Sequence, residues 1–290
     1  MNIKERIFVL YDLGISLATL SKLYRESNEE QLNHLLEGDF LELQFSLGLF
    51  NDNELELLSS IDSIQKSKSN ISKILSEFSD NKIEYFIYYE DGYPTSLKSI
   101  PSPPFFIFMK GNRSLLENKF ICSIVGTRNP TDQTLKQIDS TVQEMLSTDI
   151  VIASGLALGT DIHAHKCTLD SNGKTIAVLP SPIDDVIPKS HKPYANEILA
   201  KDGLLISEYY KSEAVFKKTN YIHRNRIISG LSNAVIIAEC SEKSGTMHTA
   251  RYAYKQKRPL YCFDNKSTGV LKILSSNSAR IYTNLSDLNF

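Results

Sequence analysis

From Ile121 almost to the end of the 290-residue chain, short apolar stretches alternate with stretches of helical character. The alternation repeats roughly every 25 to 30 residues, a spacing typical of βαβ units, in which a helix connects two parallel strands. The sequence therefore predicts an α/β fold with an extended Rossmann-like, mostly parallel, doubly wound sheet. The predicted strands are Cys122 to Val125, Ile150 to Ala153, Thr175 to Leu179, Leu204 to Ser207, Ala234 to Ala238 and Leu260 to Phe263.

Residues 1–80 have a different character and predict a small all-helical domain. Leucine and isoleucine recur there at helical spacing, and a compact turn at Leu13 to Ser16 resembles the hairpin of SAM-type and helix-hairpin-helix modules. This part holds 7 Lys/Arg against 14 Asp/Glu, whereas the remaining residues hold 25 against 20. We therefore expect two domains, 1–80 and 81–290, with the mildly basic second domain being the one that attracts a polyanion. Residues 81–112 are expected to add one or two strands to the main sheet.

Composition narrows the class of protein. With 41% hydrophobic and 23% charged residues, the chain has the balance of a soluble globular protein. No apolar run approaches the roughly 20 residues of a membrane helix, and the amino terminus lacks the layout of a signal peptide, which predicts a cytoplasmic protein without membrane contact. The four cysteines are far apart in the sequence and are interpreted as reduced core thiols.

The sequence contains no clear motif for binding a metal or a cofactor. His163, His165 and Cys167 have the spacing of metal ligands, but on a helix residues two apart point in different directions and the three cannot converge. Asp161 and His165, four residues apart, are expected to share a face and form a hydrogen bond. No G-x-G-x-x-G or P-loop motif occurs, which argues against a nicotinamide dehydrogenase or a P-loop ATPase. We predict no metal and no cofactor.

Small, polar and basic residues follow several predicted strands. Arg128 lies in a turn directly after the first strand, before a helix that begins near Thr131. Because the carboxyl ends of parallel strands meet at one edge of a sheet, we expect the cations of these loops to line that edge, where helix-terminal N–H groups also favour a phosphate. A row of cations suits a phosphate chain, whose neutralisation releases counterions. The alternative for Arg224 and Arg226 is that they pair with Glu208 and Glu239.

Seven motifs, in order and spacing, resemble the DNA-processing protein A family (DprA, also called Smf). They are Ser123-Ile-Val-Gly-Thr-Arg128, Ser154-Gly-Leu-Ala-Leu-Gly-Thr-Asp-Ile-His-Ala-His165, Thr175-Ile-Ala-Val-Leu179, Ile187-Pro-Lys189, Ile206-Ser-Glu-Tyr209, Arg224-Asn-Arg-Ile-Ile-Ser-Gly-Leu-Ser232, and Glu239 with Ser244-Gly-Thr246.

The resemblance implies a protein that binds single-stranded DNA without turning it over, protects incoming strands in natural transformation and loads the recombinase RecA. It also implies a SAM-like amino-terminal module and a homodimer. The family's basic pocket maps to Arg128 and Lys189, with the neighbours and close backbone contacts expected at Gly126, Thr127, Ser154, Gly155, Lys218, Arg224, Asn225, Arg226 and Gly245.

The chain also departs from the family pattern. Tyr221-Ile222-His223 stands where the family has Phe-Pro, and Thr246-Met247-His248 replaces Ser-Leu-Ile. The tail after Phe263 lacks the family's Pro-Gly and is too short for a winged-helix domain, which bears on dimer formation and on the RecA surface. An aromatic residue that stacks on bases is expected in such a binder. Tyr194, Tyr209 and Tyr221 are the candidates.

Two other functions fit parts of the sequence. One is a nucleotide hydrolase resembling the LOG phosphoribohydrolases, with Glu208 or Glu239 as acid or base and Arg128 holding a phosphate. The Pro-Gly-Gly and following Glu of that group are missing here. The other is a protein-binding adaptor without nucleic-acid contact, suggested by the acidic residues 1–80.

Overall fold

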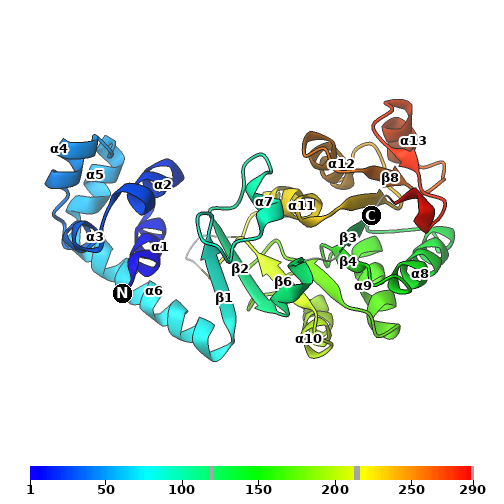
Figure 1. The fold of residues 1–290 in the computed structure, drawn as a ribbon, viewed down its shortest axis with the longest axis horizontal. Coiled ribbons are helices and arrows are strands. Elements are labelled where there is room, and N and C mark those ends of the chain that lie inside the picture. The colour runs from blue at the N-terminus through cyan, green and yellow to red at the C-terminus, as the bar shows by residue number, and fades with distance from the viewer. Residues whose placement is uncertain (118–119, 212–215, 289–290) are drawn as a thin grey trace. The chain divides into compact units, whose positions relative to one another are not determined.

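The structure, a computed structural model, describes residues 1–117, 120–211 and 216–288. The chain forms two compact units, Met1–Lys82 and Ile83–Phe290, which are described separately (Figure 1). No helix in these described ranges has both the length and the apolar character needed to cross a bilayer.

The first unit is all-helical, as its sequence periodicity predicts. Asn2, Asn28 and Asn51 each begin a helix with a capping box, and Gly14 ends the first helix at a φ of 105° that only glycine adopts readily. The first and last helices pack through the rings of Phe8 and Phe78, whose centroids lie 6.5 Å apart. The helices are α1 (Ile3–Leu13), α2 (Leu17–Glu26), α3 (Glu29–Leu36), α4 (Leu41–Leu47), α5 (Asp52–Ser59) and α6 (Ile61–Asp80).

The second unit is built on a nine-stranded sheet in the order β1-β2-β6-β5-β4-β3-β7-β8-β9. All neighbouring strands from β6 to β9 are parallel, while β2 is antiparallel to both β1 and β6. The predicted α/β fold with a mostly parallel sheet is thus confirmed. The strands are β1 (Ile83–Ile87), β2 (Phe106–Gly111), β3 (Ile121–Val125), β4 (Val151–Ser154), β5 (Thr175–Val178), β6 (Leu204–Ser207), β7 (Ala234–Ile237), β8 (Leu260–Cys262) and β9 (Arg280–Ile281).

Helices cover both faces of this sheet (Figure 1). On β3, Ile121 and Val125 join one hydrophobic cluster, whereas Cys122 and Ile124 join the other, as expected of a strand buried on both faces. The helices are α7 (Thr95–Lys98), α8 (Asp132–Leu146), α9 (Thr160–Asp170), α10 (Lys192–Ala200), α11 (Thr219–Leu231), α12 (Thr246–Lys255) and α13 (Thr268–Ser275), with 3₁₀ turns η1 (Arg113–Leu116), η2 (Lys189–His191) and η3 (Leu285–Asp287).

The chain order places a switch point beside β3. The strands β3 to β6 run outward on one side of the sheet, and β7 then returns to the other side of β3. Connections on the two sides of such a point diverge and open a crevice beyond the carboxyl ends of the strands. The loops after β3 and β7 therefore flank the place where a ligand is expected.

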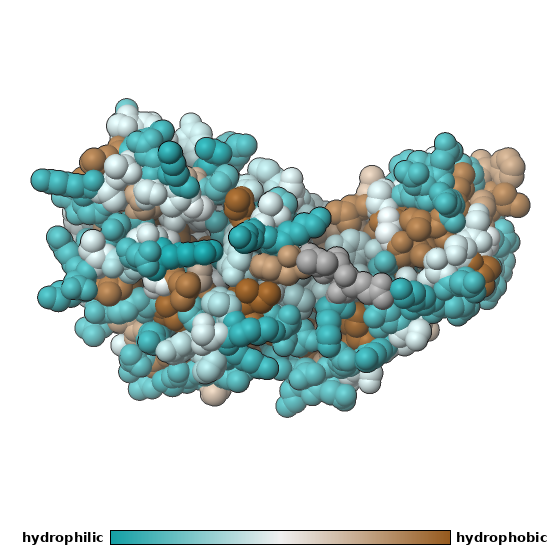
Figure 2. Space-filling view, turned by 180° about the vertical axis from the view of Figure 1, so that it is seen from behind, coloured by the Kyte–Doolittle hydropathy of each residue, from teal (hydrophilic) through white to brown (hydrophobic). Residues whose placement is uncertain are grey.

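On the face of this unit seen in Figure 2, apolar residues lie as separate spots among hydrophilic ones.

All six strands predicted from the sequence are present, with ends that differ by at most one residue. The segment 81–112 supplies β1 and β2, as expected. The prediction missed β9, whose two residues are both exposed. Main-chain pairing with β8 defines this strand, because its exposed side chains carry no apolar pattern that would predict one.

The packing of the central strands gives a stability prediction. Ile236 of β7 is completely buried, so Ile236→Ala should lower the free energy of unfolding by about 2–5 kcal/mol, through lost burial and the cavity left behind. The same substitution at Ile281, which is 42% exposed, should change it by less than about 0.5 kcal/mol. Denaturant unfolding of both variants tests this, and equal losses would contradict the assigned packing.

Candidate functional site

A cavity of about 320 Å³ lies at the switch point, beyond the carboxyl ends of β3 and β7. Its size is at the lower end of the range for ligand sites. The lining comes from the end of β3, from the loops after β3, β4 and β7, and from the first turns of α9, α11 and α12. The lining residues are Val125, Gly126, Thr127, Arg128, Ala157, Asp161, Tyr221, Ile222, Arg224, Asn225, Ser244, Gly245, Thr246 and Thr249.

Arg128 is the exposed cation at this cavity. Its guanidinium carbon lies 5.2 Å from the ring centre of Tyr221, close enough for a cation–π interaction. Phe216 in turn packs edge-on against Tyr221, with ring centres 5.7 Å apart. The stack places a permanent positive charge beside an aromatic face, a combination suited to a phosphate linked to a base.

The loop that carries Arg128 is held tightly against the loop before α9. The main-chain nitrogen and the hydroxyl of Thr160 both donate to Thr127 O, at 3.1 and 3.0 Å. Gly159 has a φ of 77°, and a Cβ there would lie 2.4 Å from the main chain of Arg128. Glycine is therefore required at 159, and it lets the two loops approach to van der Waals contact.

A second cation, Arg224, is buried beneath the cavity. Its side chain is 2% exposed, and Nη1 donates to Gly155 O at 2.5 Å and to Val178 O. A Cβ on Gly155 would lie 2.4 Å from this guanidinium, which explains a glycine there. Burial lowers the pKa of Arg224 to about 10, which still leaves it charged at neutral pH. Arg224 therefore contributes positive potential to the cavity floor while its donors serve the protein's own carbonyls.

Two further buried groups lie near Arg224. Burial raises the pKa of Asp161, although Arg224 and main-chain amides at Ala157, Gly155 and Gly126 oppose that rise. His165 Nδ1 lies 2.8 Å from Thr175 Oγ1, whose hydroxyl donates to Ile152 O and so accepts from the imidazole. Burial and the charge of Arg224 lower the pKa of His165 to about 3. The imidazole is therefore neutral at physiological pH.

The predicted hydrogen bond between Asp161 and His165 is wrong, because the imidazole of His165 bonds to Thr175. Helical spacing places the two on one side of α9, but the strand β5 supplies a closer acceptor for the imidazole, the hydroxyl of Thr175. The carboxylate of Asp161 instead interacts with the main-chain amides of Gly126, Gly155 and Ala157 at the cavity floor. No sequence pattern indicated Thr175 as the partner, because it lies on a different element.

The two candidate acid–base carboxylates are both engaged in structural contacts. Glu239 Oε2 accepts from the main-chain nitrogen of Thr131 and from the hydroxyls of Thr131 and Thr134, so it caps the start of α8. Burial tends to raise the pKa of Glu239, but these hydrogen bonds outweigh it and lower the pKa overall. Glu208 holds Arg226 in a two-point ion pair, at 2.7 and 2.6 Å.

These contacts change the expected use of the helix ends. The start of α8 was expected to offer N–H groups to a phosphate, but the Glu239 carboxylate already occupies it. The starts of α9, α11 and α12 border the cavity instead, the last of them through Gly245 and Thr246. The sequence already indicated this position for Gly245 and Thr246, because both follow the predicted strand that corresponds to β7.

The structure brings some of the predicted site residues to the cavity and places others elsewhere. Gly126, Thr127, Arg128, Arg224, Asn225 and Gly245 line it. Ser154 is buried and donates to Ile124 O, and Gly155 contributes a carbonyl to Arg224. Arg226 points to Glu208 and Ser102 O, as the alternative interpretation of this arginine held. Lys189 pairs with Asp185 but keeps its side chain 69% exposed, and Lys218 is exposed at the start of α11.

Comparisons with known proteins agree on one family. The family model described as "DNA recombination-mediator protein A" matches residues 84–289. DNA processing protein DprA of Bacillus subtilis is 32% identical over 225 residues, 76% of this chain and 75% of its own length. The corresponding protein of Streptococcus pneumoniae is 36% identical over 180 residues, and the match covers 62% of each protein. The chain thus spans between about three fifths and three quarters of these relatives.

Solved structures give the same result. The X-ray structure of DNA processing protein A from Streptococcus pneumoniae covers the whole of this chain and is itself covered completely, with a TM-score of 0.74 and 26% identity. The Helicobacter pylori protein, whose structure concerns its single-stranded DNA binding mode, has a TM-score of 0.63 and 30% identity. That match covers 72% of this chain and 94% of the other.

The buried His165 predicts a pH dependence of stability. The pKa in the folded state is about 3 and the unfolded value is about 6.5, so the unfolded state binds the extra proton as the pH falls below 6.5. Lowering the pH from 7 to 5 should cost about 2 kcal/mol through this group. Unfolding of wild type and His165→Gln at both pH values tests it, since the variant should lose less stability than wild type. His223→Gln, at an exposed histidine, is the control and should behave as wild type; identical losses in all three proteins would refute the assignment.

Proposed function

Because this chain belongs to the DNA recombination-mediator protein A family, we propose that it binds single-stranded DNA at the cavity beyond the carboxyl ends of β3 and β7, as a mediator of recombination in natural transformation. The observation that carries the proposal is the arrangement of Arg128 over Tyr221 at that cavity. The guanidinium contacts a phosphate and the neighbouring aromatic face receives a base. Both contacts are independent of base sequence, so the protein holds any strand.

The strand is proposed to run along the carboxyl edge of the sheet. Lys189 follows β5, two strands away from β3, and its exposed side chain extends the positive edge beyond the cavity. Its pairing with Asp185 is a surface ion pair, which contributes little and exchanges readily for a phosphate. Lys218, at the start of α11 and three residues before Tyr221, adds a second exposed cation. Arg224 acts from below through its charge alone.

Binding without turnover is the form of the activity that the site supports best. A phosphoribohydrolase needs a carboxylate free to act on its substrate. Glu239 is held by three hydrogen bonds at the start of α8, and Glu208 by the fork of Arg226. These engagements favour a binding protein over the hydrolase alternative.

Three further parts of the proposal rest on the family. We infer that the protein passes its strand to the recombinase RecA, that it pairs as a homodimer and that it works in the cytoplasm. The family's description as a recombination mediator supports the first. The free state of all four cysteines is compatible with a reducing compartment. The helical unit is proposed to be a SAM-like module.

The adaptor alternative rests on the helical unit. Its α4 exposes Leu41 and Phe45, four residues apart, with 57% and 86% of their surfaces accessible, and the unit carries the net negative charge. Such a surface favours contact with a protein. An adaptor without nucleic-acid contact predicts no oligonucleotide binding even at low salt, so one titration decides between the two functions.

Arg128→Ala should weaken binding to single-stranded oligonucleotides by about 10-fold or more, because a hydrogen bond to a charged group contributes about 1.5–3 kcal/mol. The loss should be similar for unrelated sequences, and the slope of log affinity against log salt should fall by about 0.7. Fluorescence anisotropy at several salt concentrations measures both.

The control for this test is Arg280→Ala. Arg280 is exposed at the start of β9, on the opposite edge of the sheet, and its removal should leave affinity and salt slope unchanged. If Arg128→Ala also binds as wild type, the strand does not lie at this cavity.

Tyr221 should contribute by stacking. Tyr221→Ala should lose about 1–3 kcal/mol of binding free energy, whereas Tyr221→Phe, which keeps the ring, should bind nearly as wild type. Tyr194→Ala tests whether the effect is specific, because Tyr194 does not line the cavity and belongs instead to a contact with Lys166. A loss for Tyr194→Ala but not for Tyr221→Ala would assign the stacking residue to the other end of the edge.

A further inference from the structure

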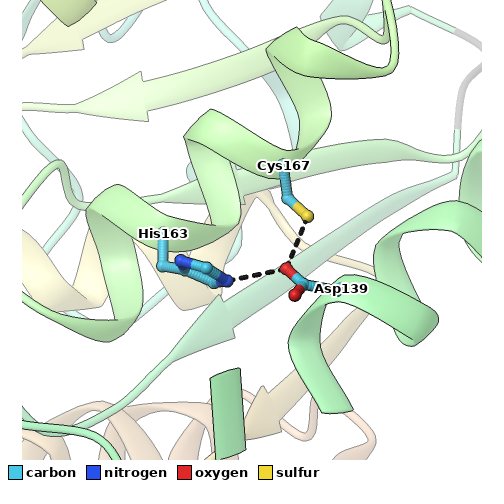
Figure 3. A group of neighbouring side chains, drawn as sticks. All are labelled: Asp139, His163 and Cys167. Carbon is cyan, nitrogen blue, oxygen red and sulfur yellow. Dashed lines mark hydrogen bonds and ion pairs between the residues drawn. The ribbon is translucent and has the colours of Figure 1, made fainter. Parts of the chain in front are cut away.

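Three side chains of different chemistry meet between α8 and α9, on the other side of α9 from His165. Asp139 comes from α8, and His163 and Cys167 come from α9, where they are four residues apart and share one face (Figure 3). His163 Nε2 lies 2.7 Å and Cys167 Sγ 2.8 Å from the same oxygen, Asp139 Oδ1. The pairwise distances between the three ligand atoms are all within 4.8 Å.

The sequence prediction of no metal site considered His163, His165 and Cys167 together. As a set of three they indeed do not converge, because His165 is turned toward β5. His163 and Cys167, however, are related as i and i+4. Asp139 lies 24 residues earlier than His163 on another helix, where local spacing does not place it.

The cluster has nearly the dimensions of a metal site. In a tetrahedral zinc site, bonds of about 2.0–2.3 Å separate neighbouring ligand atoms by roughly 3.3–3.6 Å. The two measured contacts are shorter than this by less than 1 Å, as expected when protons rather than a cation join the groups. The metal geometry requires rotations of the side chains, and these are feasible because Asp139 is 44% and His163 28% exposed. The exposure also leaves room for water as a fourth ligand.

The chemistry of the donors specifies the class of metal. A thiolate, an imidazole and a carboxylate together suit a borderline divalent ion such as Zn²⁺ and disfavour Mg²⁺ and Ca²⁺, which prefer oxygen ligands. Burial and the carboxylates of Asp139 and Asp170 raise the pKa of the Cys167 thiol, so the thiol keeps its proton until a cation binds. The other cysteines, Cys122, Cys240 and Cys262, are buried in the hydrophobic core. Cys167 is the half-exposed thiol among the four.

From this geometry we propose that Asp139, His163 and Cys167 form a Zn²⁺ site that joins α8 to α9. The ion takes the place of the two shared protons: the thiol proton leaves to solvent, and the proton of the neutral imidazole moves by exchange with solvent from Nε2 to Nδ1, so that Nε2 binds the metal. The α8 helix follows the loop of Arg128, and α9 follows the loop of Gly159. The bound ion therefore clamps together the two helices whose preceding loops form the cavity. This site does not depend on the DNA-binding proposal.

Metal titration of the full chain tests the proposal. The protein is treated with a chelator, dialysed, and titrated with Zn²⁺ in competition with a chromophoric chelator. One ion per chain is expected. Titration with Co²⁺ should produce a sulfur-to-cobalt charge-transfer band and the visible bands of a four-coordinate ion, which report the thiolate and the geometry directly. Zn²⁺ should also raise the midpoint of thermal unfolding.

Ligand variants and a matched control make the test specific. Cys167→Ser, His163→Gln and Asp139→Asn should each weaken Zn²⁺ binding by more than about 100-fold, since even the outer partners of ligands contribute about 10–100-fold. Circular dichroism checks that each variant folds; Asp139→Asn, at a half-exposed position, keeps the test valid if Cys167→Ser does not fold. His223→Gln should bind as wild type. Absence of saturable binding, or equal binding by wild type, His163→Gln and Asp139→Asn, would overturn the proposal.

Discussion

The buried guanidinium of Arg224 is the interaction on which the site depends. It lies at the carboxyl ends of β4 and β5 and donates to one carbonyl at each, Gly155 O and Val178 O. A permanent cation is costly to bury, so its hydrogen bonds and the nearby Asp161 must offset the loss of solvation. The result is a cavity floor with positive potential at the switch point beside β3.

The loops above this floor owe their form to close contacts that leave no room for side chains. Gly155 lies against the guanidinium of Arg224, and Gly159 lies against the main chain of Arg128. The hydrogen bonds of Thr160 and Glu239 then complete the hold on the loop after β3. Because these contacts are internal, Arg128 itself stays exposed and available. A site of this kind is organised before its ligand arrives, which lowers the entropy lost on binding.

Some charged residues near the cavity stabilise the fold instead of facing a ligand, and composition does not distinguish the two kinds. Arg224 and Arg226 lie two residues apart on α11, yet one supports the cavity floor and the other closes a two-point ion pair with Glu208 on another side of the helix. Glu239, two residues after β7, accepts hydrogen bonds at the start of α8, where its negative charge interacts favourably with the helix dipole.

The helices and strands and their order follow from local sequence patterns alone. Strands buried on both faces are continuous apolar runs, so β3 to β8 were predicted within one residue, and the placing of Arg128 and Gly245 after strands indicated the edge at which they meet. Local periodicity carries that information, because it depends on neighbours in the chain. Which cations remain free was decided only by the tertiary structure, as the pairing of Arg226 with Glu208 and the burial of Arg224 show. The same holds for Thr175 as the partner of His165 and for Asp139 beside Cys167, because these contacts join side chains of different elements whose distance is fixed by how helices pack on the sheet.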